Sequence, residues 1–169
     1  MYQRQLYRFA PKSVDSCFFT ASGDMLFSRA GEMSSQEEAQ QFITDNDVTF
    51  AVAFGPVMVD NGQLAEFGSY PIGENNRTYS RTAIGQRDKL HYILMTINYE
   101  DDHSVAATVS EAAEYIFSKG VVKAYALDGG QTSTMVMNGH TVNRPDWGNQ
   151  RTQSDIIYFA TALPEEVNP

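Results

Sequence analysis

The segment from Leu127 to Met135 has the residue types and spacing best suited to chemistry, because one carboxylate is followed by two glycines and three hydroxyls. An apolar run ends at Asp128, Gly129 and Gly130 follow, and the chain becomes apolar again from Met135. Paired glycines let backbone amides approach a ligand closely, and short hydroxyl side chains add donors without blocking access. The pattern predicts a strand, a polar elbow that can hold an anion, and another strand. A plain tight turn would also explain Asp-Gly-Gly taken alone.

Three arginines near the expected ends of strands form a second group suited to an anion, namely Arg81, Arg144 and Arg151. Arginine suits a phosphate because its planar guanidinium donates two parallel hydrogen bonds and stays charged when partly desolvated. Solvation or pairing with a carboxylate would explain any one of them equally well. Together with Asp128 they indicate a site for a phosphate-bearing ligand.

Composition excludes several classes of function. The chain has 169 residues, a formal net charge of -9 and a pI near 4.7, and it lacks the clustered Lys and Arg of a nucleic-acid surface. No apolar run approaches the roughly twenty residues of a membrane span, and no signal-peptide pattern follows Met1. The single cysteine, Cys17, and three histidines without ligand spacing favour neither a metal site nor a cofactor.

The first half of the chain is expected to supply hairpins, one helix and one buried strand. Two capping patterns, Ser34 with Glu37 and Ser35 with Glu38, precede a helical spacing of apolar residues. A nearly continuous β-prone run after the helix is typical of a strand buried on both faces. The expected elements are a hairpin at 16–28, a helix at 35–45, a strand at 48–54 and a hairpin through the turn at 60–62.

The second half should position the polar elbow. Thr108 with Glu111 predicts a capped helix, and Lys119-Gly120 is typical of its end. The expected elements are a loop at 68–79, strands at 81–85 and 90–97, the helix, a strand at 121–127, a hairpin at 138–139, a polar loop at 144–152 and a last strand at 155–162. These elements predict a single α+β domain over residues 1–163, built as a mixed twisted β-sheet with two main helices packed on it, and a tail at 164–169.

Four motifs, in this order, resemble the phosphodiester glycosidase family. They are the segment 53–62 with Phe54-Gly55-Pro56, the segment 81–85, the elbow with the Asn138-Gly139 turn, and the segment 143–158. The resemblance covers about residues 50 to 160, and the order of the motifs makes it specific. It implies that the chain hydrolyses a sugar-1-phosphodiester bond, of the N-acetylglucosamine type, in a surface glycan, exopolysaccharide or related phosphodiester.

The same resemblance implies roles for particular residues. Asp128 and Arg81 are expected to be catalytic. The residues expected to bind substrate are Gly129, Gly130, Thr132, Ser133, Thr134, Asn143, Arg144 and Arg151. Trp147, in a polar loop beside Gly148, is a further candidate for stacking on a sugar ring, and anchoring of that loop in the core explains it equally well. No cofactor or metal is implied, the partner is a carbohydrate phosphodiester, and the full-length protein is expected to be extracellular or at the cell surface. The oligomeric state stays open.

A second catalytic carboxylate is a further expectation, because glycosidases usually use two. The candidates are Glu74, Asp88, Asp146 and Asp155, of which Asp88 is more typical of a turn. A phosphate leaves with little help from an acid, so one carboxylate could also suffice.

Departures from the family pattern leave an alternative open. Ala126 and Gln131 replace an asparagine and a glycine, and no glycine-rich upstream motif precedes residue 50. The chain is therefore expected to be either a fragment that lacks the N-terminal part of the domain or a divergent short member of the family. The alternative is a noncatalytic glycan-binding or structural module of a phage or cell surface. A hydrolase with Ser133 as nucleophile is disfavoured, because no histidine lies in a partner motif.

Overall fold

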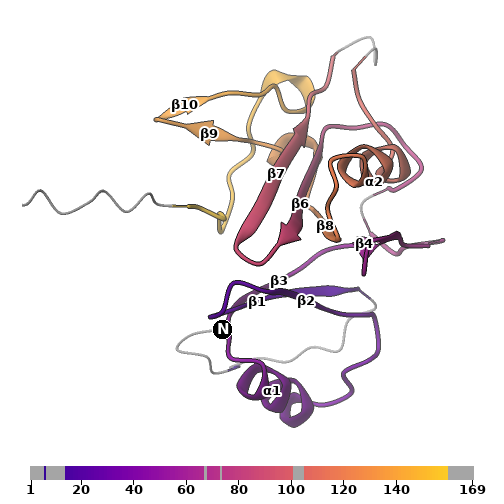
Figure 1. Cartoon of the computed structure of the whole chain (residues 1–169). Coiled ribbons are helices and arrows are strands. Elements are labelled where there is room, and N and C mark those ends of the chain that lie inside the picture. Colours follow the sequence, from indigo (N-terminus) through magenta and orange to yellow (C-terminus); the bar gives the residue numbers. More distant parts are fainter. Residues whose placement is uncertain (1–5, 7–13, 67, 73, 101–104, 160–169) are drawn as a thin grey trace, which may run out of the picture.

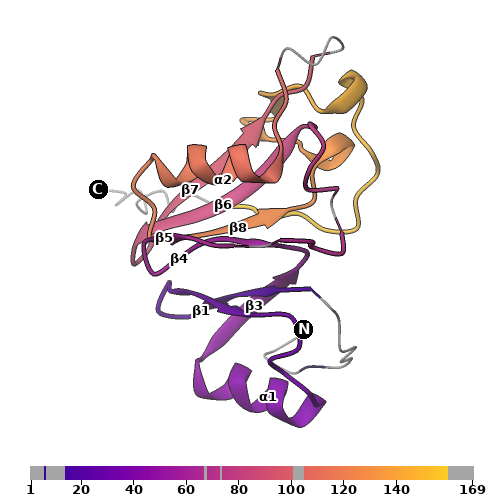
Figure 2. The ribbon, with the colours of Figure 1, turned by 90° about the vertical axis from the view of Figure 1, so that its right-hand side faces the viewer.

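The helices and strands of the protein form four layers. The computed structural model describes residues 6, 14–66, 68–72, 74–100 and 105–159. Helix α1 covers one face of a three-stranded sheet, whose other face packs on a five-stranded sheet, and α2 covers the far face of that second sheet (Figures 1 and 2). The predicted α+β class is confirmed.

The three-stranded sheet contains β1 (Ser16–Thr20), β2 (Met25–Ser28) and β3 (Val48–Ala53), in the order β2-β1-β3 with antiparallel pairing. Helix α1 (Gln36–Asp45) begins at Ser35, whose side chain accepts a hydrogen bond from the Glu38 amide. Of the two capping patterns in the sequence, the second therefore starts the helix.

Alternation along β1 explains how this sheet packs on both sides. Phe18 joins Ile43 and Val48 in the core beneath α1. Its neighbours Cys17 and Phe19 point to the opposite face and enter the core between the two sheets. Successive strand side chains point to opposite faces, so one short apolar strand can serve both cores.

The five-stranded sheet has the order β5-β4-β8-β6-β7, and all its strand pairs are antiparallel. Its members are β4 (Val57–Asp60), β5 (Gln63–Leu64), β6 (Arg81–Asp88), β7 (His91–Ile97) and β8 (Lys123–Leu127). Helix α2 (Val109–Phe117) starts with the predicted capping box of Thr108 and Glu111.

The central strand β8 is buried on both faces and leads directly into the elbow. Ala124 and Ala126 pack towards α2, whereas Tyr125 packs into the core between the sheets. Small residues on the first face let α2 approach the sheet closely. Because both faces are covered, the position of Leu127 and of the residues after it is fixed by two cores.

Smaller elements follow β8. A 3-10 helix, η1 (Gly130–Thr132), precedes the hairpin of β9 (Val136–Met137) and β10 (His140–Thr141), and a second 3-10 helix, η2 (Asp146–Gly148), follows it. The hairpin turn is at Asn138-Gly139, as predicted, with φ values of 50° and 78°.

Three details of the prediction are wrong. The strands form separate antiparallel sheets of three, five and two strands instead of one mixed sheet. Strand β3 is not buried on both faces, because it is an edge strand and its residues 49–51 are exposed. The last predicted strand is absent over residues 155–159, and its final residues, like the tail at 164–169, lie outside the described residues.

Candidate functional site

The elbow after β8 is held tightly against the start of β6. The Gly130 amide donates a hydrogen bond of 2.9 Å to the Ser80 carbonyl. A Cβ atom at Gly129 would lie only 2.5 Å from the same carbonyl oxygen, which is closer than real Cβ contacts. The glycine at 129 is therefore required by the close approach of two backbones, and the Gly130 amide is removed from the donors expected to face substrate.

Asp146 anchors the η2 loop to this same point. Its side chain is 1% exposed, and its Oδ1 accepts hydrogen bonds from the Ser80 amide at 2.8 Å and from the Ser80 hydroxyl at 2.7 Å. Its Oδ2 would lie 3.4 Å from a Cβ atom at Gly130. Ser80 thus joins β6, the elbow and the η2 loop through three hydrogen bonds.

Residues at the far end of the elbow are also engaged by the fold. The hydroxyl of Ser133 is buried and donates to the Arg81 carbonyl at 3.1 Å. Asn143 donates to the Ser133 carbonyl and accepts from the Met135 amide, both at 2.6 Å. The Thr132 hydroxyl donates to the Gly129 carbonyl at 2.7 Å. These three side chains stabilise the shape of the loop, and the burial of Ser133 gives no support to its use as a nucleophile.

Arg81 lies in the interior. Its Nε donates to the Ala107 carbonyl at 2.9 Å, and its Nη2 donates to the carbonyls of Glu74 at 3.1 Å and Arg77 at 2.5 Å. Burial lowers the pKa of this guanidinium, and the nearby Asp146 is the strongest of the groups that act in the opposite direction. The arginine holds the loop before β6 onto the start of α2.

Arg151 has the opposite environment. Its Nη2 lies 2.8 Å from Asp128 Oδ2, and the two side chains are 58% and 44% exposed. The Arg151 amide donates to the Gln131 carbonyl at 3.2 Å, which brings this part of the chain back to the elbow. An exposed carboxylate and an exposed guanidinium therefore sit together at the end of β8, in reach of a ligand.

The η2 loop also presents an aromatic side chain. Trp147 is 59% exposed and has a φ of 56°, and its ring centroid lies 6.3 Å from that of Tyr99. Arg144 supports this loop through an ion pair with Glu100, and its carbonyl accepts from the Tyr99 amide at 3.2 Å. A substrate bound by Arg144, as predicted, would therefore compete with the Glu100 carboxylate for this guanidinium.

The four candidates for a second carboxylate are widely separated. Only Asp146 lies against the elbow. Glu74 pairs with Arg77 at 3.2 Å and accepts from the Tyr79 hydroxyl at 2.6 Å. Asp88 lies at the other end of β6, where it caps the turn into β7 through the Lys89 amide. Asp155 is exposed, and its recorded partner is its neighbour Ser154.

The site therefore has two parts. The buried base consists of Ser80, Arg81, Ser133 and Asp146, and the exposed rim consists of Asp128, Arg151 and Trp147. Sequence reasoning missed Ser80 and Tyr99 because neither belongs to a motif. The available signal was the position of Ser80, which directly precedes Arg81 at the start of β6.

Within the part of the chain that the structure describes, no group of three or more His, Cys, Asp or Glu side chains is placed to hold a metal ion. Neither α1 nor α2 has the length and hydropathy that crossing a bilayer requires.

Known proteins resemble this chain in sequence and in fold. The SPbeta prophage-derived uncharacterized protein YomE of Bacillus subtilis (strain 168) is 23% identical over 149 residues, which cover 86% of this chain and 23% of YomE. The catalytic domain of zebrafish N-acetylglucosamine-1-phosphodiester alpha-N-acetylglucosaminidase, solved in a form auto-inhibited by its pro-peptide, has a TM-score of 0.58 and 18% identity, covering 78% of this chain and 44% of that one.

A hypothetical protein from Synechocystis has the same fold with a TM-score of 0.53 and 14% identity, covering 83% of this chain and 32% of that one. The chain thus spans between about a quarter and a half of the length of these relatives. The phosphodiester glycosidase family matches residues 10–160, which is most of the chain. The chain therefore belongs to the phosphodiester glycosidase family.

Proposed function

We propose that this chain acts in the hydrolysis of a sugar-1-phosphodiester bond of the N-acetylglucosamine type, in a surface glycan or a related phosphodiester, at the cell surface or outside the cell. The observation that carries the proposal is the pairing of Asp128 with Arg151 at 2.8 Å on the exposed rim. Family membership supports a carbohydrate substrate and hydrolase chemistry.

In the proposed reaction the bond between the sugar C1 and the phosphate oxygen breaks, the oxygen of a water molecule bonds to C1 as the new hydroxyl, and the proton that this water loses goes to solvent. The phosphate leaves with the bonding electron pair as an oxyanion. Arg151 stabilises that charge with its guanidinium fork, which is the geometry that suits a phosphate. When the phosphate binds Arg151, it replaces Asp128 as the partner of the guanidinium. The Asp128 carboxylate is then free to face the sugar carbon, which develops positive charge as the bond breaks.

The rim supplies the remaining contacts in this proposal. Trp147 offers an exposed aromatic face to the sugar ring, since saccharides pack their apolar faces on aromatic side chains. Arg81 belongs to the buried base of the site and does not contact the substrate in this scheme, because its guanidinium is bound to three carbonyls. Its contribution is to position the start of β6 under the elbow.

The test is turnover of a synthetic N-acetylglucosamine-1-phosphodiester with a small alkyl group on the phosphate, measured as release of free sugar. The Asp128→Asn variant should lose at least about a hundredfold in turnover, as expected when a charged group at the reacting centre is neutralised. Its melting temperature should stay close to that of the unsubstituted chain, because Asp128 is exposed.

Asp88→Asn is the matched control, because Asp88 is an acidic residue at the opposite end of the sheet. It should keep full turnover. Equal turnover in the two variants would overturn the assignment of Asp128.

A noncatalytic glycan-binding or phage structural module is the second candidate. The observations that favour it are the coverage of less than half of the zebrafish catalytic domain, and the use of Arg81 and Ser133 inside the fold. A chain that binds the phosphodiester without releasing sugar, with affinity that falls on Arg151→Ala substitution, would support this candidate over the enzyme.

A further inference from the structure

Strand β7 leaves one edge of the five-stranded sheet open. It is the last strand in the sheet order and pairs with β6 alone among the described strands. Its residues from Tyr92 to Ile97 contain no charge and no proline, which are the usual means of protecting an edge. An uncharged edge strand of this length is a template for another strand.

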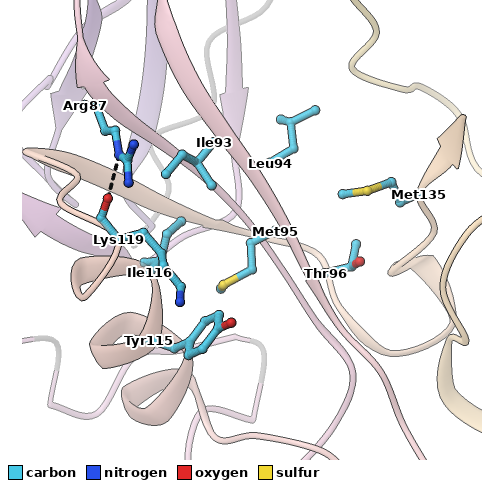
Figure 3. A pocket seen from close by; sticks show the side chains of 9 residues that line it. All are labelled: Arg87, Ile93, Leu94, Met95, Thr96, Tyr115, Ile116, Lys119 and Met135. Atoms are coloured by element: carbon cyan, nitrogen blue, oxygen red, sulfur yellow. Dashed lines mark hydrogen bonds between the residues drawn. The ribbon is translucent and has the colours of Figure 1, made fainter.

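A groove runs along this edge. It has a volume of about 440 Å³, and Figure 3 shows β7 crossing it between α2 and Met135. Ile93 and Met95 line the side towards α2, where Tyr115 and Lys119 form the wall. A free edge beside an apolar groove has the form of sites that accept an extended peptide, in which backbone bonds give affinity and alternate side chains fill the groove.

The C-terminal segment of the same chain passes this edge without pairing to it. Arg151 contacts Asp128 just beyond the end of β8, whereas the Phe159 ring lies beside Tyr92, tilted by 44° with the ring centroids 6.2 Å apart. Since Leu127 is opposite Thr82 and Thr82 is opposite Thr96, the segment travels from the Thr96 end of β7 towards its Tyr92 end. It therefore runs antiparallel to β7.

Four of the five residues from 155 to 159 are exposed, and Ile157 alone among them is partly covered. Ile156 and Tyr158 are 79% and 77% exposed, whereas Ile157 between them is half-buried. Ile156 and Tyr158 thus leave two large apolar side chains in solvent, and the groove lined by Ile93 and Met95 offers apolar surface that can bury them. The strand pattern of residues 155–159 in the sequence agrees with this placement.

We propose that residues 155–159 dock on the open edge of β7 as a sixth, antiparallel strand of the same sheet, with Phe159 opposite Tyr92. Because the two strands are antiparallel, residue numbers along the segment fall as those along β7 rise. Leu94 falls opposite Ile157, and Thr96 falls opposite Asp155.

This register places the side chains consistently. Ile156 falls opposite Met95, and Tyr158 falls opposite Ile93, so both exposed apolar residues enter the groove beside α2. Ile157 and Phe159 stay on the other face with Leu94 and Tyr92. A shift of one residue would reverse all of these assignments, because side chains alternate with a period of two.

Docking also has a consequence for the rim, which rests on the proposed function. Only three residues separate Arg151 from Asp155. A strand that begins at Asp155 opposite Thr96 fixes the chain close to Arg151, and so reduces the freedom of the guanidinium that contacts Asp128. The C-terminal strand is then a positioning element for the phosphate-binding group.

A pair of cysteines tests the register in the full chain. The Leu94→Cys/Ile157→Cys variant should form an intramolecular disulfide under mild oxidation, detected by mass spectrometry of the non-reduced monomer. Cys17 does not interfere, because it is fully buried. The control is Leu94→Cys/Ile156→Cys, in which the second cysteine points to the opposite face and should crosslink at least about tenfold less.

Equal crosslinking of the two pairs, or none in either, would overturn the proposal. A disulfide that joins two chains would overturn it too, since the occupant of the edge would then be a second copy. These readouts do not involve turnover, so their failure is distinct from failure of the proposed activity.

Side-chain burial gives an independent measurement. Tyr158→Asp should lower the melting temperature by about 5 °C, because docking buries this ring in the groove. Ser154→Asp, which precedes the docked strand, should leave the melting temperature unchanged. Equal melting temperatures for the two variants would show that residue 158 stays in solvent, and would contradict the docked strand.

Discussion

The buried base and the exposed rim of the site use the same charged residue types for different purposes. In the base, Asp146 binds two donors of Ser80, and Arg81 donates to three backbone carbonyls. In the rim, Asp128 and Arg151 have each other as the recorded side-chain partner, in contact with solvent. A buried charge must be satisfied by fixed partners, whereas an exposed pair can exchange its partner for a ligand at small cost.

Candidate reactive residues are therefore charged residues whose partner is exposed, and charged residues with fixed buried partners serve the fold. The buried base holds the shape of the elbow, and the exposed rim carries the side chains that the proposed function assigns to the ligand. Substitutions of the same kind in the two regions should therefore separate stability from function. Those in the buried base should change mainly the free energy of unfolding, and those in the exposed rim should change mainly ligand binding.

The largest effect on stability is expected for the two aspartates. Asp146→Ala should lower the free energy of unfolding by about 3 kcal/mol, because it leaves both Ser80 donors without a buried acceptor and removes the negative charge near the Arg81 guanidinium. Asp128→Ala should lower it by less than about 1 kcal/mol, as is typical of exposed pairs. Urea denaturation of both variants measures the difference, and similar losses would remove the distinction between base and rim.

A smaller contrast is expected for the two arginines when each is replaced by lysine. Arg81→Lys should lower the free energy of unfolding by about 2 kcal/mol, because one ammonium group cannot reach three carbonyls in the geometry of the fork. Arg151→Lys keeps the charge beside Asp128 and should change stability by less than about 0.5 kcal/mol. If Arg81→Lys unfolds at the urea concentration of the unsubstituted chain, the carbonyl contacts contribute little.

Trp147 allows a test within the rim itself. Its φ of 56° is unfavourable for any residue with a Cβ atom. Trp147→Gly should therefore be more stable than Trp147→Ala by about 1 kcal/mol. Both variants should weaken substrate binding equally, since both lose the ring. A larger loss of binding in one of them would mean that the backbone at 147, and not the ring, contacts the ligand.

The smallest effect concerns an exposed carboxylate that has a structural role. Hydrogen bonds from the Thr108 amide and hydroxyl lower the pKa of Glu111 in the folded chain. The resulting stability is present above the pKa of an unfolded glutamate, about 4.3, and is lost as pH falls through the lower folded value. Below that pH the melting temperature of Glu111→Gln should decrease less on acidification than that of the unsubstituted chain. An equal decrease in the two proteins would show that the cap carboxylate is not involved.

Local signals in the sequence predicted most elements of the fold. The cap at Ser35, the capping box at Thr108 and the turn at Asn138-Gly139 each depend on a few adjacent residues, and all three are confirmed. The burial of β3 was not predictable in this way, since it depends on which strand ends at the edge of the sheet. The separation into two main sheets depends likewise on pairings between distant segments.

The site was predictable in part for the same reason. The elbow at Asp128 and the position of Arg151 in a following loop could be read from the residues. The carbonyl partners of Arg81 come from Glu74, Arg77 and Ala107, which share no motif. The attachment of Asp146 to Ser80 joins residues 66 positions apart. Such partners are fixed by the tertiary fold, and a single sequence carries no periodic signal for them.

Because Gly129 lies against the Ser80 carbonyl, the presence of glycine at this position in a sequence descended from this chain says nothing about activity. A side chain at 129 is excluded by packing, so a descendant that had lost all activity would still retain glycine there in order to fold. Random mutagenesis with selection for solubility alone would recover the same glycine. Packing does not require Asp128, so under the proposed function its retention is the better marker of a working hydrolase.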